Sequence, residues 1–272
     1  MEEKTMKEMS FLDHLEVLRW MLIRSTIAIV IAGAATFFLW DYIDALIFGP
    51  LKSDFITYRS LCDLSHFLNF GETICVTDLE NHFIIQNTEM EGQMNMMVWS
   101  CITAGFILSF PYILWELWGF VSPALYDKEK KNAKFFIFVS SILFFLGVCF
   151  GYFVVVPMSI NFFATFQVSD VVKNQFSLDS YISMIKTAVV SSGLFFELPI
   201  VIYFLTKLGI VNPEMLRKYR KIAVIIVLVV AAIVTPPDVV SQVIVAIPML
   251  LIFEASVILS AIVDKRQKKE LM

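Results

Sequence analysis

The sequence predicts an all-α membrane protein with six transmembrane helices, of which the last two are short. Of its 272 residues, 58% are hydrophobic, 26 are Phe and only 17% are charged, which is too little charge to cover a soluble domain of this length. A helix of about 20 largely apolar residues crosses a bilayer core about 30 Å thick. Six apolar stretches, in one polytopic domain covering residues 1–272, are expected to span the membrane at residues 23–43, 94–118, 135–157, 185–206, 221–235 and 239–263.

The distribution of basic residues predicts which loops face the cytoplasm. Seventeen of the 21 Lys and Arg residues lie before or at the very start of the first span, after the last, or between the second and third or the fourth and fifth, counting the first residue of the fifth. The remaining four are Lys52, Arg59, Lys173 and Lys186. Because cytoplasmic loops carry an excess of Lys and Arg, both termini are predicted to lie in the cytoplasm.

The N-terminal segment, residues 8–22, has the pattern of an amphipathic helix. Its apolar residues recur at helical spacing beside a charged face, at Phe11, Leu12, Leu15, Leu18, Met21 and Leu22. This spacing predicts an interfacial helix that leads into the first span. The segment lacks the short apolar core and small-residue cleavage site that are typical of a signal peptide.

Residues 44–93 are predicted to form an extracytoplasmic loop, which carries eight acids. Two of the four cysteines, Cys62 and Cys75, lie in it. An oxidising compartment permits a disulfide that closes this short stretch, and we expect one here. Cys101 and Cys149 fall in predicted spans, where we expect them to be buried as small apolar residues.

The fourth span contains one acid, Glu197. A charged group at the middle of a membrane helix costs about 2.5–3.5 kcal/mol on insertion scales. A protonated glutamate could simply bond to a neighbouring helix, but this is a costly way of holding helices together. We therefore favour a functional role for Glu197, as a contact for a partner or a substrate.

The fifth and sixth spans form a hairpin of short helices. Residues 222–234 are 13 apolar residues, about 20 Å of helix, and residues 235–238 (TPPD) have the composition of a tight turn. The pair could be a re-entrant hairpin or two spans that thin the bilayer locally. Asp238 could cap the last helix, and Gln242 could hydrogen-bond to another helix.

The sequence contains no motif of a known enzyme class. Walker A, G-x-G-x-x-G, H-E-x-x-H and G-x-S-x-G patterns are absent, and His14, His66 and His82 are scattered rather than grouped as metal ligands. We therefore expect no catalytic residue, no metal and no cofactor. A binding or transport role is favoured over catalysis.

Four motifs occur in order along the chain, at residues 11–19 (FLDHLEVLR), 118–131 (WGFVSPALYDKEKK), 195–199 (FFELP) and 235–248 (TPPDVVSQVIVAIP). Together they resemble the TatC family, the receptor subunits of the twin-arginine protein translocase, over essentially the whole chain. The resemblance implies a concave six-helix bundle in the bacterial cytoplasmic (inner) membrane. It also implies binding of the twin-arginine signal peptides of folded cargo at the cytoplasmic face, recruitment of single-span TatA/TatB-type subunits, self-association, and transport driven by the proton-motive force. No nucleic acid partner is expected.

The resemblance also implies where the signal peptide binds. Two guanidinium groups need fixed carboxylates, with which arginine can form bidentate pairs. Glu129 is the first candidate, and Glu16 the second, although Val17 stands where the family usually has its N-terminal acid. The candidate signal-peptide residues are Glu129, Glu16, Tyr126, Leu125, Pro123, Phe120, His14 and Arg19.

By the same resemblance, Glu197, Gln242, Thr235 and Asp238 are expected to contact partner helices, and Pro50 resembles a structural loop proline of the family. Two other functions stay open at this point. A secondary transporter would use Glu197 as its coupling carboxylate, although no internal repeat of broken helices is evident. A scaffold would have no ligand of its own.

Overall fold

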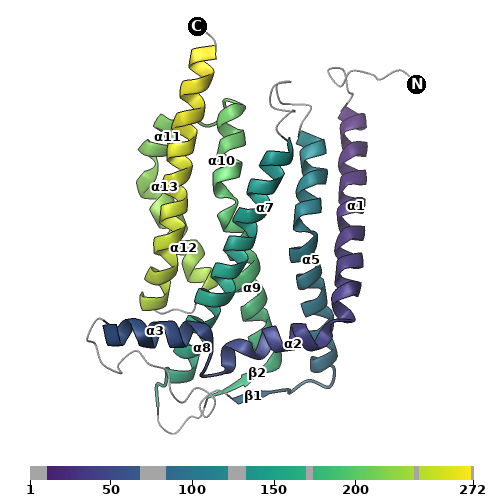
Figure 1. Ribbon diagram of the computed structural model, residues 1–272, viewed down its shortest axis with the longest axis vertical. Helices are drawn as coiled ribbons and strands as arrows, with labels where there is room; N and C mark the ends of the chain where they lie inside the picture. Colours follow the sequence, from purple (N-terminus) through teal and green to yellow (C-terminus); the bar gives the residue numbers. More distant parts are fainter. Residues whose placement is uncertain (1–10, 68–83, 122–132, 170–173, 236–238, 271–272) are drawn as a thin grey trace.

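The computed structural model describes residues 11–67, 84–121, 133–169, 174–235 and 239–270. Its long helices stand roughly side by side, from α1 on one side of the molecule to α13 on the other (Figure 1). The short elements α2, α3, β1 and β2 lie across one end, and both termini are at the opposite end. The elements are α1 (Phe11–Phe37), α2 (Trp40–Phe48), a 3-10 turn (Gly49–Leu51), α3 (Ile56–Phe67), β1 (Ile84–Gln86), α5 (Gly92–Val121), α7 (Ala133–Phe150), a π-helical turn (Gly151–Val155), α8 (Val156–Thr165), β2 (Gln175–Ser177), α9 (Leu178–Phe196), α10 (Leu198–Lys207), α11 (Pro213–Lys218), α12 (Arg220–Val234) and α13 (Val239–Glu270).

Five helical segments of the described chain are long and apolar enough to cross a membrane. They are Leu15–Phe37, Gly92–Phe120, Lys134–Thr165, Leu178–Lys207 and Gln242–Lys265. The other candidate is α12, whose 15 residues extend for about 22 Å, so the fifth span is short, as predicted. The sixth is not short as a helix, because α13 runs for 32 residues. The uninterrupted apolar stretch is shorter than the helix, because α13 continues through the charged residues that follow.

The first span differs from its predicted bounds at both ends. α1 is one uninterrupted helix from Phe11 to Phe37, so the described part of the segment 8–22 is helical and leads into the first span without a break. Its position at the membrane interface stays a prediction. A turn follows α1, and α2 then runs across the end of the bundle (Figure 1). The expected span of 23–43 therefore includes the start of α2.

The third span continues beyond its predicted end at Pro157 and reaches Thr165 through a π-helical turn. Proline has no backbone N–H, so Pro157 cannot bond to the carbonyl of Phe153 four residues earlier. The hydroxyl of Thr57 on α3 donates to this carbonyl oxygen instead. The π-helical turn thus provides an attachment point for α3.

The segment 44–93 is more ordered than a loop. It contains most of α2, all of α3 and the strand β1, which pairs in parallel with β2 so that Ile84 lies opposite Gln175. Sequence patterns gave no indication of these strands, because three residues are too few for a detectable alternation. The two strands connect the segment before α5 to the start of α9.

Three tyrosine hydroxyls fix the end of α2 and the turn that follows it. Tyr181 donates to the carbonyl oxygen of Ile47 and Tyr152 to that of Leu46, both at 2.7 Å. The hydroxyl of Tyr58 lies 3.2 Å from the carbonyl oxygen of Pro50 and 3.1 Å from that of Pro157, and burial raises the pKa of Tyr58. Pro50 is fully buried.

Small residues allow the helices to approach closely, as is common in membrane bundles. A Cβ on Gly105 of α5 would lie 2.6 Å from the backbone nitrogen of Gly33 on α1. A Cβ on Gly147 of α7 would lie 2.5 Å from the carbonyl oxygen of Ser192 on α9. Beside this crossing, the rings of Phe110 and Phe144 stack with their centroids 3.5 Å apart.

Candidate functional site

The pairing of α1 with α5 brings two of the sequence motifs to the same end of the molecule. The two helices are antiparallel: the Thr36 hydroxyl lies 3.3 Å from the carbonyl oxygen of Cys101, and Arg24 Nη1 lies 3.6 Å from Glu116 Oε2. From Arg24 to Glu16 is about 12 Å of helix, and from Glu116 to the end of α5 about 7.5 Å. Glu16 therefore lies near the level at which α5 ends and the second motif continues.

The described residues at this end include charged side chains on α1 and a packed aromatic cluster at the end of α5. Glu16 and Arg19 are exposed, whereas Val17 and Phe120 are half-buried. Trp118, one turn before the end of α5, stacks on Phe136 of α7 with ring centroids 5.6 Å apart. It also contacts Phe204 of α10 edge to face, with centroids 5.5 Å apart. The end of α5 is thus anchored on two neighbouring helices.

Several predicted site residues lie outside the described residues. They are Pro123, Leu125, Tyr126, Glu129, Asp238 and Cys75. The backbone of His14 lies in α1, but its side chain is not among those described.

Glu197 lies at a break in the fourth span. α9 ends at Phe196, and α10 starts at Leu198 with Pro199 in its first turn, where a proline is tolerated because its N–H is not needed. The side chain of Glu197 is buried, and the hydroxyl of Ser140 on α7 donates to its Oε2 atom. Its Oε1 atom is buried without a hydrogen-bond partner among the described residues. One oxygen of this buried carboxyl group is therefore available to another donor.

Thr235 and Gln242 are both engaged within the chain. The amide of Gln242 donates to the carbonyl oxygen of Leu228 at 3.0 Å, which joins α13 to α12. The hydroxyl of Thr235 is buried and donates to the carbonyl oxygen of Ala231 at 2.8 Å. Both side chains therefore already have a hydrogen-bond partner within the chain.

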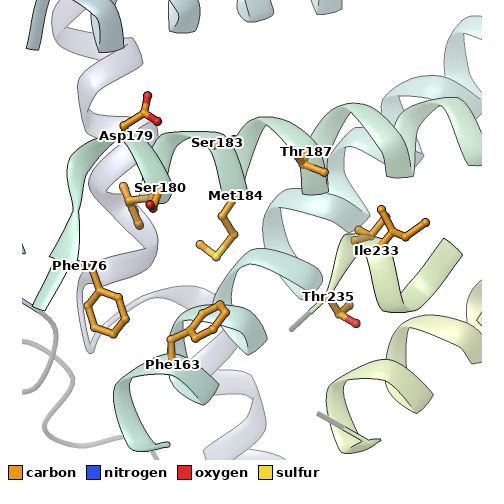
Figure 2. A pocket seen from close by; sticks show the side chains of 11 residues that line it. Phe163, Phe176, Asp179, Ser180, Ser183, Met184, Thr187, Ile233 and Thr235 are labelled. Atoms are coloured by element: carbon orange, nitrogen blue, oxygen red, sulfur yellow. The ribbon is translucent and has the colours of Figure 1, made fainter. Parts of the chain in front are cut away.

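An open cavity of about 580 Å³ lies between α8, α9 and the end of α12 (Figure 2). Thr235 and Ile233 line it from α12, and Phe163 lines it from α8. The side of α9 contributes Asp179 and a row of hydroxyl-bearing residues, together with Met184. The cavity thus combines an apolar floor with polar groups at the end of the molecule that carries α2 and α3.

The profile of the family described as "Sec-independent protein translocase protein (TatC)" matches residues 13–248. The chain belongs to the TatC family.

Individual TatC proteins match nearly the full length of the chain. The Sec-independent protein translocase protein TatC of Blattabacterium sp. subsp. Periplaneta americana is 42% identical over 267 residues, which cover 96% of this chain and 98% of the relative. The TatC protein of Aquifex aeolicus is 32% identical over 262 residues, with coverage of 96% and 98%. A crystal structure of the twin arginine translocase receptor TatC superposes with a TM-score of 0.69 at 32% identity, covering 91% of this chain and 97% of that one. A second, in DDM, gives 0.72 at 31% identity, with coverage of 91% and 99%.

Membership of the TatC family confirms the predicted fold class and decides among the predicted functions. The short α12 counts as a transmembrane helix of the six-helix TatC fold. The chain is the receptor subunit of a twin-arginine translocase and not an enzyme. The interpretation as a solute transporter is therefore set aside.

Three polar contacts of this TatC chain were not predicted from its sequence. Ser140 stands in an apolar run, where nothing marks it as the partner of an acid 57 residues away. Glu116 accepts a hydrogen bond from Tyr112 at 2.7 Å and pairs with Arg24 across α1 and α5. The spacing of Tyr112 and Glu116, four residues apart on one helix, could have indicated the contact between these two.

The cysteines only partly follow expectation. Cys62 is disulfide-bonded, while its predicted partner, Cys75, lies outside the described residues. Cys101 is buried as expected, but Cys149 is exposed on α7, where it lines an open cavity beside α5 and α9. Within the described residues, no group of three or more His, Cys, Asp or Glu could hold a metal ion.

Proposed function

We propose that this TatC protein binds the twin-arginine signal peptide of folded cargo at its cytoplasmic face, in a bacterial cytoplasmic membrane, with both termini in the cytoplasm. Both termini and α11 lie at the same end of the molecule (Figure 1). Seventeen of the 21 basic residues belong to the sequence segments that are predicted to face the cytoplasm, because an excess of Lys and Arg marks that side of a membrane protein. The peptide would therefore meet the receptor at this end.

The observation that carries the proposal is the register between α1 and α5. It brings the N-terminal motif with Glu16 to the level at which the second motif, with Glu129, begins. Two carboxylates from segments far apart in sequence suit a ligand with two adjacent guanidinium groups. Glu16 is exposed, whereas Val17 is half-buried. Glu16 therefore supplies the carboxylate that is absent at position 17.

Photocrosslinking tests the peptide site. A photoreactive residue at position 129 or 16 is expected to crosslink a signal peptide carrying the Arg-Arg pair. It should crosslink the same peptide with Lys-Lys much less, because lysine cannot form the bidentate pair.

Export of a folded twin-arginine reporter provides a second test. Glu129→Gln should reduce this export about tenfold or more, the loss expected for one charge-assisted hydrogen bond. Glu214 of α11, exposed at the same end, provides the matched control Glu214→Gln, which should leave export unchanged. Equal crosslinking of both peptides, or equal losses in the two variants, would contradict the proposed site.

Single-span partners of the TatA/TatB type, and further copies of the chain, associate with the membrane-embedded part. The unpartnered Oε1 atom of Glu197 supports a contact with a polar group on a partner helix. The cavity beside Thr235, at the end of the short α12, supports a second contact. The proton-motive force drives the transport step, in which no residue of this chain performs covalent chemistry.

A further inference from the structure

A second cavity, of about 370 Å³, opens where α5, α7 and α9 diverge toward the end of the molecule that carries α2. Its walls are aliphatic and aromatic, with Ile107, Val148 and Ile185 among them. The hydroxyls of Thr103 and Tyr152, which also line it, donate to the carbonyl oxygens of Trp99 and Leu46. Their hydrogen-bonding capacity is thus used within the protein, and the crevice presents an apolar surface.

One charged residue, Lys186 of α9, lines this apolar crevice. Its Nζ atom lies 5.0 Å from the centroid of the Trp99 ring on α5, and it forms no ion pair with a carboxylate among the described residues. Lys186 is eight residues from the start of α9, about 12 Å into the helix. Because helical side chains point toward the N-terminus of their helix, its ammonium is directed toward the membrane surface at the α2 end.

An apolar crevice next to a single ammonium group matches the two parts of a phospholipid, an acyl chain and a phosphate. The chain of the lipid would occupy the crevice, and its phosphate would meet the ammonium of Lys186 next to Trp99, since tryptophan favours the membrane interface. A helix of a partner does not fit, because two turns of helix about 10 Å across occupy roughly 850 Å³, more than twice the volume of the crevice. A single acyl chain is narrow enough to enter.

We propose that the crevice between α2, α5, α7 and α9 binds one acyl chain of an anionic phospholipid whose phosphate pairs with Lys186. This site is separate from the signal-peptide region at the opposite end and from Glu197, and it does not depend on the proposed peptide site. It makes the receptor selective for an anionic lipid in the leaflet at the α2 end.

Quenching of Trp99 fluorescence by brominated lipids tests the site directly. The full chain, with Trp20, Trp40, Trp115 and Trp118 replaced by Phe, is reconstituted in phosphatidylcholine vesicles that contain a small fraction of brominated phosphatidylglycerol or brominated phosphatidylcholine. We expect the brominated phosphatidylglycerol to bind about fivefold more strongly, the factor that one lysine near an anionic lipid supplies. Lys186→Gln should abolish this preference.

Lys218 provides the matched control, because its ammonium also lies over an aromatic ring, that of Tyr219, but at the opposite end of the molecule. Lys218→Gln should keep the preference for phosphatidylglycerol. Ala104→Phe, which fills the crevice from α5, should reduce quenching by both brominated lipids. Equal quenching by the two lipids before substitution, or an unchanged preference in Lys186→Gln, would overturn the proposal.

Native mass spectrometry offers a second measurement that retains all five tryptophans. The unsubstituted chain and Lys218→Gln should each retain one phosphatidylglycerol molecule that Lys186→Gln loses. Retention of the same number of lipids by all three proteins would exclude a site at Lys186.

Discussion

The hydroxyl of Ser140 donates to one oxygen of the buried carboxyl group of Glu197, while the other oxygen has no partner among the described residues. Removal of one partner from a buried polar pair costs about 1–3 kcal/mol, because the remaining group keeps its desolvation penalty. Ser140 therefore positions the acid that is proposed to meet a partner helix.

Ser140→Ala should lower the thermal unfolding temperature of the protein in detergent, because neither oxygen of Glu197 then has a donor in the described part of the chain. The expected loss is about 1–3 kcal/mol. The adjacent Ser141 is the matched control: its hydroxyl bonds to the carbonyl oxygen of Ile137 in its own helix, so Ser141→Ala should have little effect. In a Glu197→Ala background the effect of Ser140→Ala should disappear; if the two losses simply add, the pair does not interact.

At this scale the sequence predicted the acid but not its setting. Glu197 could be singled out because a charge inside an apolar segment is costly. Ser140 could not, since serine is common in membrane helices and its partner depends on how α7 and α9 cross. The hydrogen bond expected from Gln242 to another helix is confirmed, since its amide donates to the backbone of α12, whereas its contact with a partner helix stays a prediction.

Close contact between α1 and α5 determines the register on which the proposed signal-peptide site depends. The Cβ of any residue larger than glycine at position 105 would lie 2.6 Å from the backbone of Gly33 and from the carbonyl oxygen of Ile29. Backbone atoms cannot give way as a flexible side chain can, so the two helices would have to separate.

Gly105→Ala is expected to destabilise the protein by about 1–3 kcal/mol through this overpacking. Gly119 lies in the same helix, and a Cβ there would meet nothing within 4 Å. Gly119→Ala should therefore be neutral or stabilise the protein by up to about 1 kcal/mol, since alanine favours the helix. Denaturation of both variants in one detergent provides the comparison, and equal unfolding temperatures would argue against a tight α1–α5 contact.

Element boundaries were predictable only where polarity changes. The apolar stretches located the spans, but the π-helical turn at Gly151–Val155 and the strands β1 and β2 arise from contacts with distant segments. Thr57 and Tyr58 on α3 supply such contacts. Local sequence patterns do not contain this information.

The arrangement of the whole molecule places α2, α3 and the disulfide-bonded Cys62 at one end and both termini at the other (Figure 1). A disulfide persists in an oxidising compartment, while clustered basic residues favour the cytoplasm. The disulfide and the basic residues both favour the proposed orientation, with the two termini in the cytoplasm.

Thiol labelling in intact cells tests this orientation. In a chain with Cys101 and Cys149 replaced by Ser, cysteine at the exposed position 52, after α2, should react with a membrane-impermeant maleimide. Cysteine at the exposed position 217, in α11, should react only after the cells are permeabilised. The reverse pattern would invert the topology.

The order in which the described helices contact one another also bears on how the chain is completed during synthesis. α1 packs mainly on α5, so the first two spans can form their shared interface before the third has left the ribosome. The hydroxyl of Thr206 on α10, by contrast, is buried against Ser260 of α13 at 2.8 Å. The Thr206 hydroxyl also bonds to the carbonyl oxygen of Ile202 in its own helix, so the fourth span can insert without α13. The contact with Ser260 then forms only when the last helix arrives, and this side of the receptor is completed last.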